Sequence, residues 1–237
     1  MLLKVMKMTI QRSKWYQLRT KLSISDISDK IRAYTYEQSD SFGFDLVSIR
    51  ESSISVRYSE KFIHIDSFLN AYGEDVTSET VRYKIINLSV SIIDDGKYLI
   101  HLENSPRSTL DLFYNLEKVI QSDLSLSLIS INILDFLESI KYRDEFKQFK
   151  IKKAVFSGIT ITPKSRAKIE ITSSQNALLD FKKKYNNSSF IIDKINCHFR
   201  FNGEEVSLEL RKTGTISHSK KLLSVLNDEL LKIAINM

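Results

Sequence analysis

The sequence contains one cysteine, two prolines and six glycines in 237 residues. The single cysteine, Cys197, excludes an intramolecular disulfide, and together with only four scattered histidines it argues against a structural zinc site. The scarcity of proline and glycine argues against collagen-like repeats and compositional disorder. No apolar run approaches the roughly 18 residues that would span a membrane, and lysines interrupt residues 1–7 too early for a signal peptide. These absences predict a globular protein located in the cytoplasm.

Catalytic motifs are also absent. The chain has no glycine-rich phosphate-binding loop, no pair of cysteines, no zinc-protease helix motif and no nucleophile elbow. The four histidines, His64, His101, His198 and His218, fall in different predicted elements, and none has a second metal ligand at a suitable spacing. The first three fall on predicted strands, where a solvated or hydrogen-bonded side chain is the simplest interpretation. The sequence therefore predicts no cofactor, no metal site and no catalytic residue.

Charge is present but unevenly distributed along the chain. The net charge is +6, yet residues 1–140 hold 16 Lys and Arg against 19 Asp and Glu, a balance of −3. Residues 141–237 hold 19 against 10, a balance of +9. Such asymmetry between halves indicates a polyanionic partner for the basic half.

The clearest structural signal is a hairpin near the C-terminus. Residues 194–201 and 205–211 both alternate polar and apolar, and Asn202-Gly203 between them tolerates the positive φ angles of a type I′ turn. A two-residue loop makes opposed residue numbers sum to 405, so that Cys197 faces Leu208 among other apolar pairs. A slip of one residue would expose these side chains, so the turn and the pattern predict the same register.

A second hairpin is predicted around Asp94-Asp95-Gly96. A two-residue loop would mix the two faces, whereas a three-residue loop with Gly96 in the left-handed conformation places Val90 opposite Ile100. We therefore predict a type I turn followed by a G1 bulge.

Helices are predicted where apolar residues recur at helical spacing. One starts at Ser105-Pro106, with proline at its first position. Another is capped by Ser173-Ser174, and the last begins at Ser217 or Ser219. Further predictions are a first strand over residues 2–10, a strand over 124–128, a helix over 134–146, one or two helical turns over 66–72, and a surface loop over 73–78.

These elements predict an α+β fold of antiparallel hairpins with helices packed on one face. We predict two subdomains, a slightly acidic one over residues 1–143 and a basic one over 144–237 with the order β-β-α-β-β-α. Residues 86–121 and 193–233 both follow the order strand, glycine turn, strand and helix, with Gly96 aligned to Gly203. The resemblance has two explanations, a duplicated module or chance recurrence of a common motif.

The basic residues of the C-terminal half are the candidate functional residues. Lys150 with Lys152, and Arg166 with Lys168, place like charges on one face of two neighbouring predicted strands. Such an arrangement is destabilising unless a phosphate backbone neutralises it; the alternative is a lysine-rich solvated face. The predicted nucleic-acid-binding residues are Lys150, Lys152, Lys153, Lys164, Arg166, Lys168, Lys182, Lys183, Lys184 and Arg200.

The composition, rich in Lys, Ile, Asn and Ser, resembles that of proteins encoded by AT-rich mobile elements, prophages and bacterial defence islands. Our leading hypothesis is a non-enzymatic, nucleic-acid-binding accessory or sensor protein of this kind, whose acidic N-terminal half binds a protein partner or a second copy. One alternative is a scaffold subunit without nucleic-acid contact. The other is a metal-dependent nuclease that uses Glu205 and Glu209, although cross-strand pairing with arginine explains the same residues.

Overall fold

The computed structural model describes residues 10–38, 41–185 and 189–235. The described residues form five α-helices and eleven strands, and the strand pairings are antiparallel. The predicted α+β class with antiparallel strands is therefore confirmed, and the fold is dominated by its sheet. The contacts divide the chain into two compact units, a central unit of residues 16–127 and a terminal unit that joins the chain up to residue 15 to residues from 128 onward. The predicted boundary at residue 143 falls inside the terminal unit.

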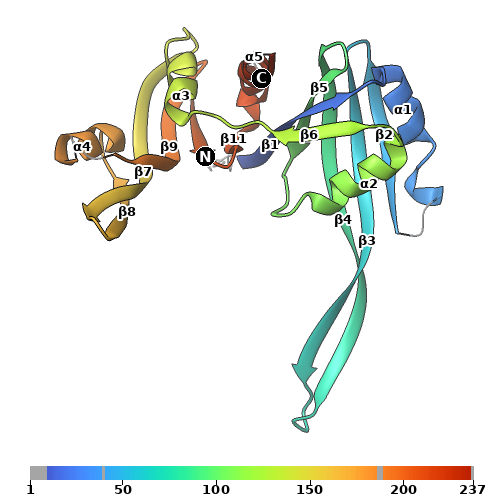
Figure 1. The fold of residues 1–237 in the computed structure, drawn as a ribbon. Coiled ribbons are helices and arrows are strands. Elements are labelled where there is room, and N and C mark those ends of the chain that lie inside the picture. The colour runs from blue at the N-terminus through green and yellow to red at the C-terminus, as the bar shows by residue number, and fades with distance from the viewer. Residues whose placement is uncertain (1–9, 39–40, 186–188, 236–237) are drawn as a thin grey trace, which may run out of the picture. The chain divides into compact units, whose positions relative to one another are not determined.

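The central unit is a curved sheet with two helices against it (Figure 1). Its strands pair in the order β2-β3-β4-β5, and the end of β1 completes it. One apolar core joins the sheet to the helices, with Ile31 of α1 and Leu116 of α2 buried against Val56, Leu88 and Ile100. The elements are β1 (Ile10–Thr20), α1 (Ile24–Arg32), the short 3₁₀ helix η1 (Tyr36–Gln38), β2 (Phe42–Arg50), β3 (Ser53–Leu69), β4 (Asp75–Asp94), β5 (Lys97–Glu103), α2 (Leu110–Ile120) and β6 (Leu124–Leu128).

The start of α2 differs from the prediction. The helix begins at Leu110, after Thr109, and not at Ser105-Pro106. Asn104 ends β5 with a φ of +46°, and the side chain of Tyr16 bonds Thr109 across 3.1 Å, which holds the intervening segment as a loop. The buried face of α2 carries Leu112, Leu116, Val119 and Ile120. The strand predicted over residues 124–128 is confirmed as β6.

The hairpin of β4 and β5 has the predicted register. Val90 pairs with Ile100 and Ile92 pairs with Tyr98. Gly96 has a φ of +67°, and a register shift just before the turn marks the predicted bulge. The alternation of apolar residues and the turn chemistry therefore selected one pairing correctly.

The hairpin of β3 and β4 is much longer than predicted. The helical turns expected over residues 66–72 and the loop over 73–78 are wrong, because β3 continues to Leu69 and β4 begins at Asp75. The side chain of Asn70 accepts hydrogen bonds from the backbone N–H groups of Tyr72 and Glu74, which closes the turn. Figure 1 shows the outer half of this hairpin extending beyond the other strands of the unit as a twisted two-stranded arm, which we define as residues 61–83.

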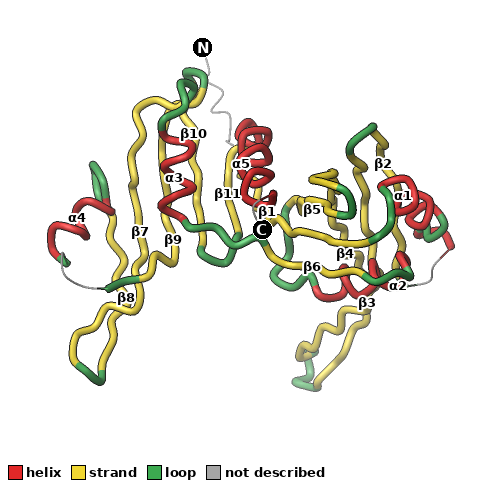
Figure 2. Tube along the Cα trace, turned by 45° about the horizontal axis from the view of Figure 1, so that its top comes forward, coloured by secondary structure: helices red, strands yellow, loops and turns green. Residues whose placement is uncertain are grey.

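The terminal unit contains the remaining strands of the same eleven-stranded antiparallel sheet. Its strands pair in the order β8-β7-β9-β10-β11, and residues 10–14 of β1 pair with β11 (Figure 2). Phe181 of α4 stacks on Phe156 of β7 with ring centres 3.7 Å apart. The elements are α3 (Ile133–Lys141), β7 (Phe146–Thr162), β8 (Ser165–Thr172), α4 (Ala177–Lys184), β9 (Ile191–Phe201), β10 (Glu204–Arg211), β11 (Thr215–Ser219), the 3₁₀ helix η2 (Lys220–Leu222) and α5 (Leu223–Ile235).

The helix starts of this unit differ in detail from the predictions. Asparagine side chains cap α3 and α4, at Asn132 and Asn176, because the carboxamide oxygen accepts the free N–H groups of the first turn. The α3 helix ends at Lys141, so the helix predicted to reach residue 146 is too long. The first strand predicted over residues 2–10 lies almost wholly outside the described residues.

The C-terminal hairpin is confirmed in full. Asn202 and Gly203 have φ angles of +50° and +84°, and Cys197 pairs with Leu208. The strand β11 was missed, because the sequence favoured a serine cap at Ser217 or Ser219. Thr215–Ser219 instead pairs with β1 on one side and β10 on the other, and α5 begins only at Leu223.

Candidate nucleic-acid interface

Three lysines of β7 share the outward face of the terminal sheet although their spacing of three residues does not suit a regular strand. Lys147, Lys150 and Lys153 would alternate between faces if β7 were regular. The register between β7 and β9 shifts three times, and two of the shifts fall between these lysines, one between Lys147 and Lys150 and one between Ile151 and Lys153. Each of these two shifts inserts an extra residue in β7, as a β-bulge does. The bulges therefore bring all three lysines to one face.

The first bulge is strained. Gln148 has a φ of +55°, in the left-handed region that non-glycine residues seldom adopt. A backbone of this kind costs about 1–3 kcal/mol and is found most often at functional sites. Here its effect is to turn Lys150 outward, opposite His198 on β9.

Two adjacent rows across the sheet therefore carry three cations and a histidine. Lys147 lies opposite Arg200, and Lys150 lies opposite His198 in the next row, about 7 Å away along the strands. All four side chains are exposed. Neither Lys150 nor Arg200 has an ion-pair or hydrogen-bond partner within the described ranges, whereas Lys147 lies 3.9 Å from the fully exposed Asp144.

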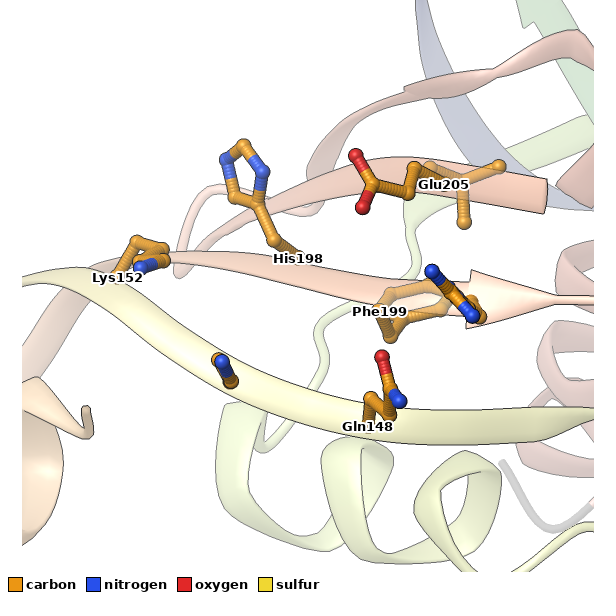
Figure 3. Close-up of a pocket in the computed structure, with 8 residues that line it drawn as sticks. Gln148, Lys152, His198, Phe199 and Glu205 are labelled. Atoms are coloured by element: carbon orange, nitrogen blue, oxygen red, sulfur yellow. The ribbon is translucent and has the colours of Figure 1, made fainter. Parts of the chain in front are cut away.

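These rows border a hollow of about 230 Å³ on the face of β7, β9 and β10. Figure 3 shows the side chains of His198 and Glu205 projecting from the two neighbouring strands on the same side of the sheet, with Lys152 and Gln148 along β7. We call this the basic hollow. The polar residues that line it are Gln148, Lys150, Lys152, His198, Arg200 and Glu205.

Other predicted residues on this unit are neutralised. Lys153 forms an ion pair of 2.6 Å with Glu170, and this bond lowers the pKa of that carboxyl. Lys168 lies 3.4 Å from Asp193, which also binds Lys212 at 2.7 Å. Burial raises the pKa of Asp193, but the bond from Lys212 and further bonds from neighbouring side chains outweigh it, so that the pKa lies below its usual value.

The remaining predicted residues lie away from the hollow. Lys164 is in the turn between β7 and β8, and Arg166 donates to the Gly158 carbonyl oxygen across 3.3 Å. Lys182, Lys183 and Lys184 are exposed at the end of α4. The expectation that Lys150 and Lys152 face Arg166 and Lys168 across neighbouring strands is wrong, because β8 pairs only with the part of β7 from Lys153 onward.

The aromatic side chains near the hollow are mostly occupied. Phe149 stacks on Phe199 with ring centres 5.1 Å apart, and Phe156 is fully buried. Tyr142 is 77% exposed and has the ammonium group of Lys141 5.4 Å from its ring centre. Of these three aromatics, Tyr142 alone has an open ring face that could stack on a base.

The two acidic candidates have different surroundings. Glu205 lines the basic hollow, opposite Arg200. Glu209 bonds Arg211 of the same strand at 2.6 Å and lies 3.8 Å from Lys194 of the neighbouring strand, so its cross-strand partner is a lysine and not the expected arginine. No group of three or more His, Cys, Asp or Glu side chains suited to a metal ion occurs in the described part of the chain. None of the helices described is long and apolar enough to cross a membrane.

Two histidines are buried in the sheets. His101 on β5 contradicts the solvated interpretation, and His218 on β11 is buried as well. The Nδ1 atom of His218 lies 2.9 Å from the Ser219 carbonyl oxygen and therefore donates to it, so that Nε2 accepts from the Ser13 hydroxyl at 3.0 Å. Burial lowers the pKa of His218. Cys197 is fully buried, and its predicted place in the core is confirmed.

Comparison with known proteins gives no family. No family model matches the chain, and no curated protein matches it by sequence. Seven chains of solved structures resemble it, among them the di-domain ARO/CYC StfQ from the steffimycin biosynthetic pathway. That match covers 96% of this chain and 97% of the other, with 8% identity and a TM-score of 0.21, and it carries no argument about fold or function.

Proposed function

We propose that the protein binds nucleic acid through backbone phosphates at the basic hollow, as a non-enzymatic accessory or sensor. The observation that carries the proposal is the like-charge row of Lys147 opposite Arg200, with Lys150 in the next row opposite His198. Like charges directly opposite each other on a sheet are destabilising, and a phosphate backbone is a polyanion that neutralises several of them at once. Recognition of this kind positions the nucleic acid without reading its sequence.

The strain at Gln148 supports the same proposal. A regular β7 would turn Lys150 into the core face and separate it from Lys147. The bulge at Gln148 keeps both cations on the outward face. We therefore relate its backbone strain to the arrangement of the charges and not to core packing. The neighbouring cations Lys153, Lys168 and Lys212 are paired with carboxylates, whereas the hollow has Lys150, Lys152 and Arg200 around the single carboxylate of Glu205.

A double substitution tests the proposal. Lys150→Ala with Arg200→Ala removes two unpaired cations. Each cation that no longer meets a phosphate should flatten the slope of log K against log salt by about one, so the pair should flatten it by about two. The matched control is Lys164→Ala with Lys183→Ala, which removes the same charge from exposed sites outside the hollow and should leave the slope unchanged. Generic DNA and RNA at about 50–200 mM salt are the probes. Absence of any binding at the lower salt, or an unchanged slope in the first variant, contradicts the proposal.

The nuclease alternative rests on Glu205 alone, since Glu209 already bonds Arg211 and lies close to Lys194. A cleavage assay with magnesium or manganese separates the two hypotheses. Metal-dependent cleavage that is lost in Glu205→Gln, with the fold retained, would favour the nuclease.

We also infer that the chain contains two copies of one module. The orders β1-α1-β2-β3-β4-β5-α2 and β6-α3-β7-β9-β10-β11-α5 correspond element by element, with β8 and α4 inserted in the second. The hydrogen-bonded orders β2-β3-β4-β5 and β7-β9-β10-β11 correspond as well. In this correspondence Gly96 matches Gly214 rather than Gly203. A Cβ atom on Gly96 would lie 2.9 Å from the Thr20 carbonyl oxygen, and one on Gly214 would lie 2.6 Å from that of Ile129.

The correspondence identifies what is particular to the first copy. The hairpin β9–β10 closes with the two-residue turn Asn202-Gly203, whereas its counterpart β3–β4 continues into the arm. Replacing residues 61–83 with Asn-Gly should therefore leave a folded protein. Loss of the β-sheet signal in the circular dichroism spectrum of this variant would contradict a shared module.

A further inference from the structure

The arm of residues 61–83 has an unusual distribution of apolar side chains. In the body of the hairpin the even-numbered residues Ile54, Val56 and Tyr58 of β3 are buried, and the odd-numbered ones face outward. In the arm most of the large apolar residues are odd-numbered, with Ile63 and Ile65 on β3 and Val81 and Tyr83 on β4 among them, while Phe62 and Phe68 are even-numbered. The more apolar face therefore changes sides along the same two strands.

No bulge accounts for the change. Every residue pair from Ser53–Ser91 to Leu69–Asp75 keeps one register, so both strands switch at the same level. The switch coincides with Glu60 and Lys84, which form an ion pair of 3.2 Å across the hairpin. A coordinated change in both strands places the arm's apolar face on the side opposite the core.

The two faces of the arm differ in chemistry. The even-numbered face has His64 Nε2 2.9 Å from Asp66 and Arg82 3.4 Å from the same carboxylate, and it also exposes Phe62 and Phe68. The odd-numbered face carries five large apolar side chains of the arm, with Ile85 just beyond it, each between 50% and 66% exposed: Ile63, Ile65, Leu69, Val81 and Tyr83. At on the order of 100 Å² each, these six side chains expose roughly 600 Å² on one face, at the upper end of what monomeric proteins expose.

The apolar face also has a charge polarity. Lys61 lies at the end near the body, beside Tyr83, and Glu79 lies two rows farther out, beside Ile65. Both side chains are exposed, and neither has an ion-pair partner in the part of the chain that the structure describes. The row between them is Ile63 with Val81. The sequence of charges along the face is thus positive, apolar and negative.

We propose that the arm is a dimerisation element, in which the apolar faces of two copies pack antiparallel about a twofold axis at the Ile63–Val81 row. That axis brings the Lys61 row of each copy level with the Glu79 row of the other, so the face is complementary to itself, as a twofold interface requires. Two faces of roughly 600 Å² bury roughly 1,200 Å² in total, which is the lower end of the range for specific interfaces. Packing of two sheets face to face at this spacing is a standard arrangement.

Sedimentation of the full chain across about 1–100 µM, without nucleic acid, tests the proposal. We expect a monomer–dimer equilibrium. Val81→Glu should raise the dissociation constant by at least about tenfold, because it buries an unpaired charge at the centre. The matched control is Thr80→Glu, one residue away on the opposite face, which should leave the constant within about twofold. A chain that is monomeric throughout, or a dimer insensitive to Val81→Glu, overturns the proposal.

A charge exchange tests the register. Lys61→Glu and Glu79→Lys should each weaken the dimer, because each places like charges at the same level of the interface. The two together should restore the dissociation constant to within about threefold of the native value, since the pairs are remade with reversed sign. If the single variants weakened the dimer only by destabilising the arm, the double variant would not recover dimerisation. Failure of the double variant to recover dimerisation would overturn the twofold arrangement.

Discussion

The turn glycines offer a quantitative test of how this fold is specified. Gly203 and Gly214 both have positive φ angles, +84° and +70°. A Cβ atom on Gly203 would meet nothing within 4 Å, whereas one on Gly214 would lie 2.6 Å from the Ile129 carbonyl oxygen. Gly203→Ala should therefore cost only the left-handed backbone term, about 1–2 kcal/mol. Gly214→Ala should add an overpacking term of about 1–3 kcal/mol.

Asparagine substitutions separate the two terms. Asparagine tolerates the left-handed region, so Gly203→Asn should lose less stability than Gly203→Ala. At Gly214 both substitutions should be similarly damaging, because the steric clash is common to them.

Urea unfolding followed by fluorescence is a suitable assay. The chain has one tryptophan, Trp15, which is 1% exposed and donates its indole N–H to Asn227 across 2.8 Å. The unfolding midpoint should fall without a change in slope. An equal loss at Gly203→Ala and Gly214→Ala would refute the assignment of the clash, and no loss at Gly203→Ala would refute the type I′ turn.

Two further predictions concern buried titratable groups. Burial lowers the pKa of His218, so the unfolded state takes up a proton that the folded state does not. The free energy of unfolding should therefore fall as the pH drops below about 6.5. His218→Gln should remove this part of the pH dependence, whereas the control His64→Gln, at an exposed site, should retain it. Burial raises the pKa of the Cys197 thiol and shields it from reagents. An aromatic disulfide reagent should therefore label the unfolded chain promptly and the native chain only at the rate of global unfolding. Rapid labelling of the native protein would contradict the burial of Cys197 in the core.

Local sequence determined the hairpins well and the longer elements poorly. At Gly96 and at Asn202-Gly203 the turn residues and the apolar alternation agree, so only one register satisfies both. In the β3–β4 hairpin the apolar alternation changes phase, so residues 66–78 carry no continuous strand signal. The strand β11 lies between β1 and β10, and nothing near Thr215 in the sequence reveals a partner two hundred residues away.

The sequence named several cations of the basic hollow but only part of their grouping. A regular strand places Lys150 and Lys152 on one face, and both line the hollow, but only the bulges bring Lys147 and Lys153 to the same face as Lys150. The carboxylates that neutralise Lys153 and Lys168 come from Glu170 and Asp193, on other strands. The excess of positive charge could therefore be predicted from composition. Which lysines are neutralised by carboxylates depends on the tertiary structure. Gln148 gave no sequence signal, because its left-handed backbone arises from the bulge.

The pairing of β1 with β11 has a consequence for synthesis on the ribosome. Ile10 is opposite Ser219 and Lys14 is opposite Thr215. This part of β1 therefore cannot complete its pairing until β11 has been synthesised. At ~5–20 residues per second, roughly 10–40 s separate the emergence of the two strands. The central unit lies wholly between them in the sequence and is complete before β11 appears. Until then residues 10–14 present an unpaired strand edge, and this interval is when the nascent chain is most open to mispairing or to capture by a chaperone.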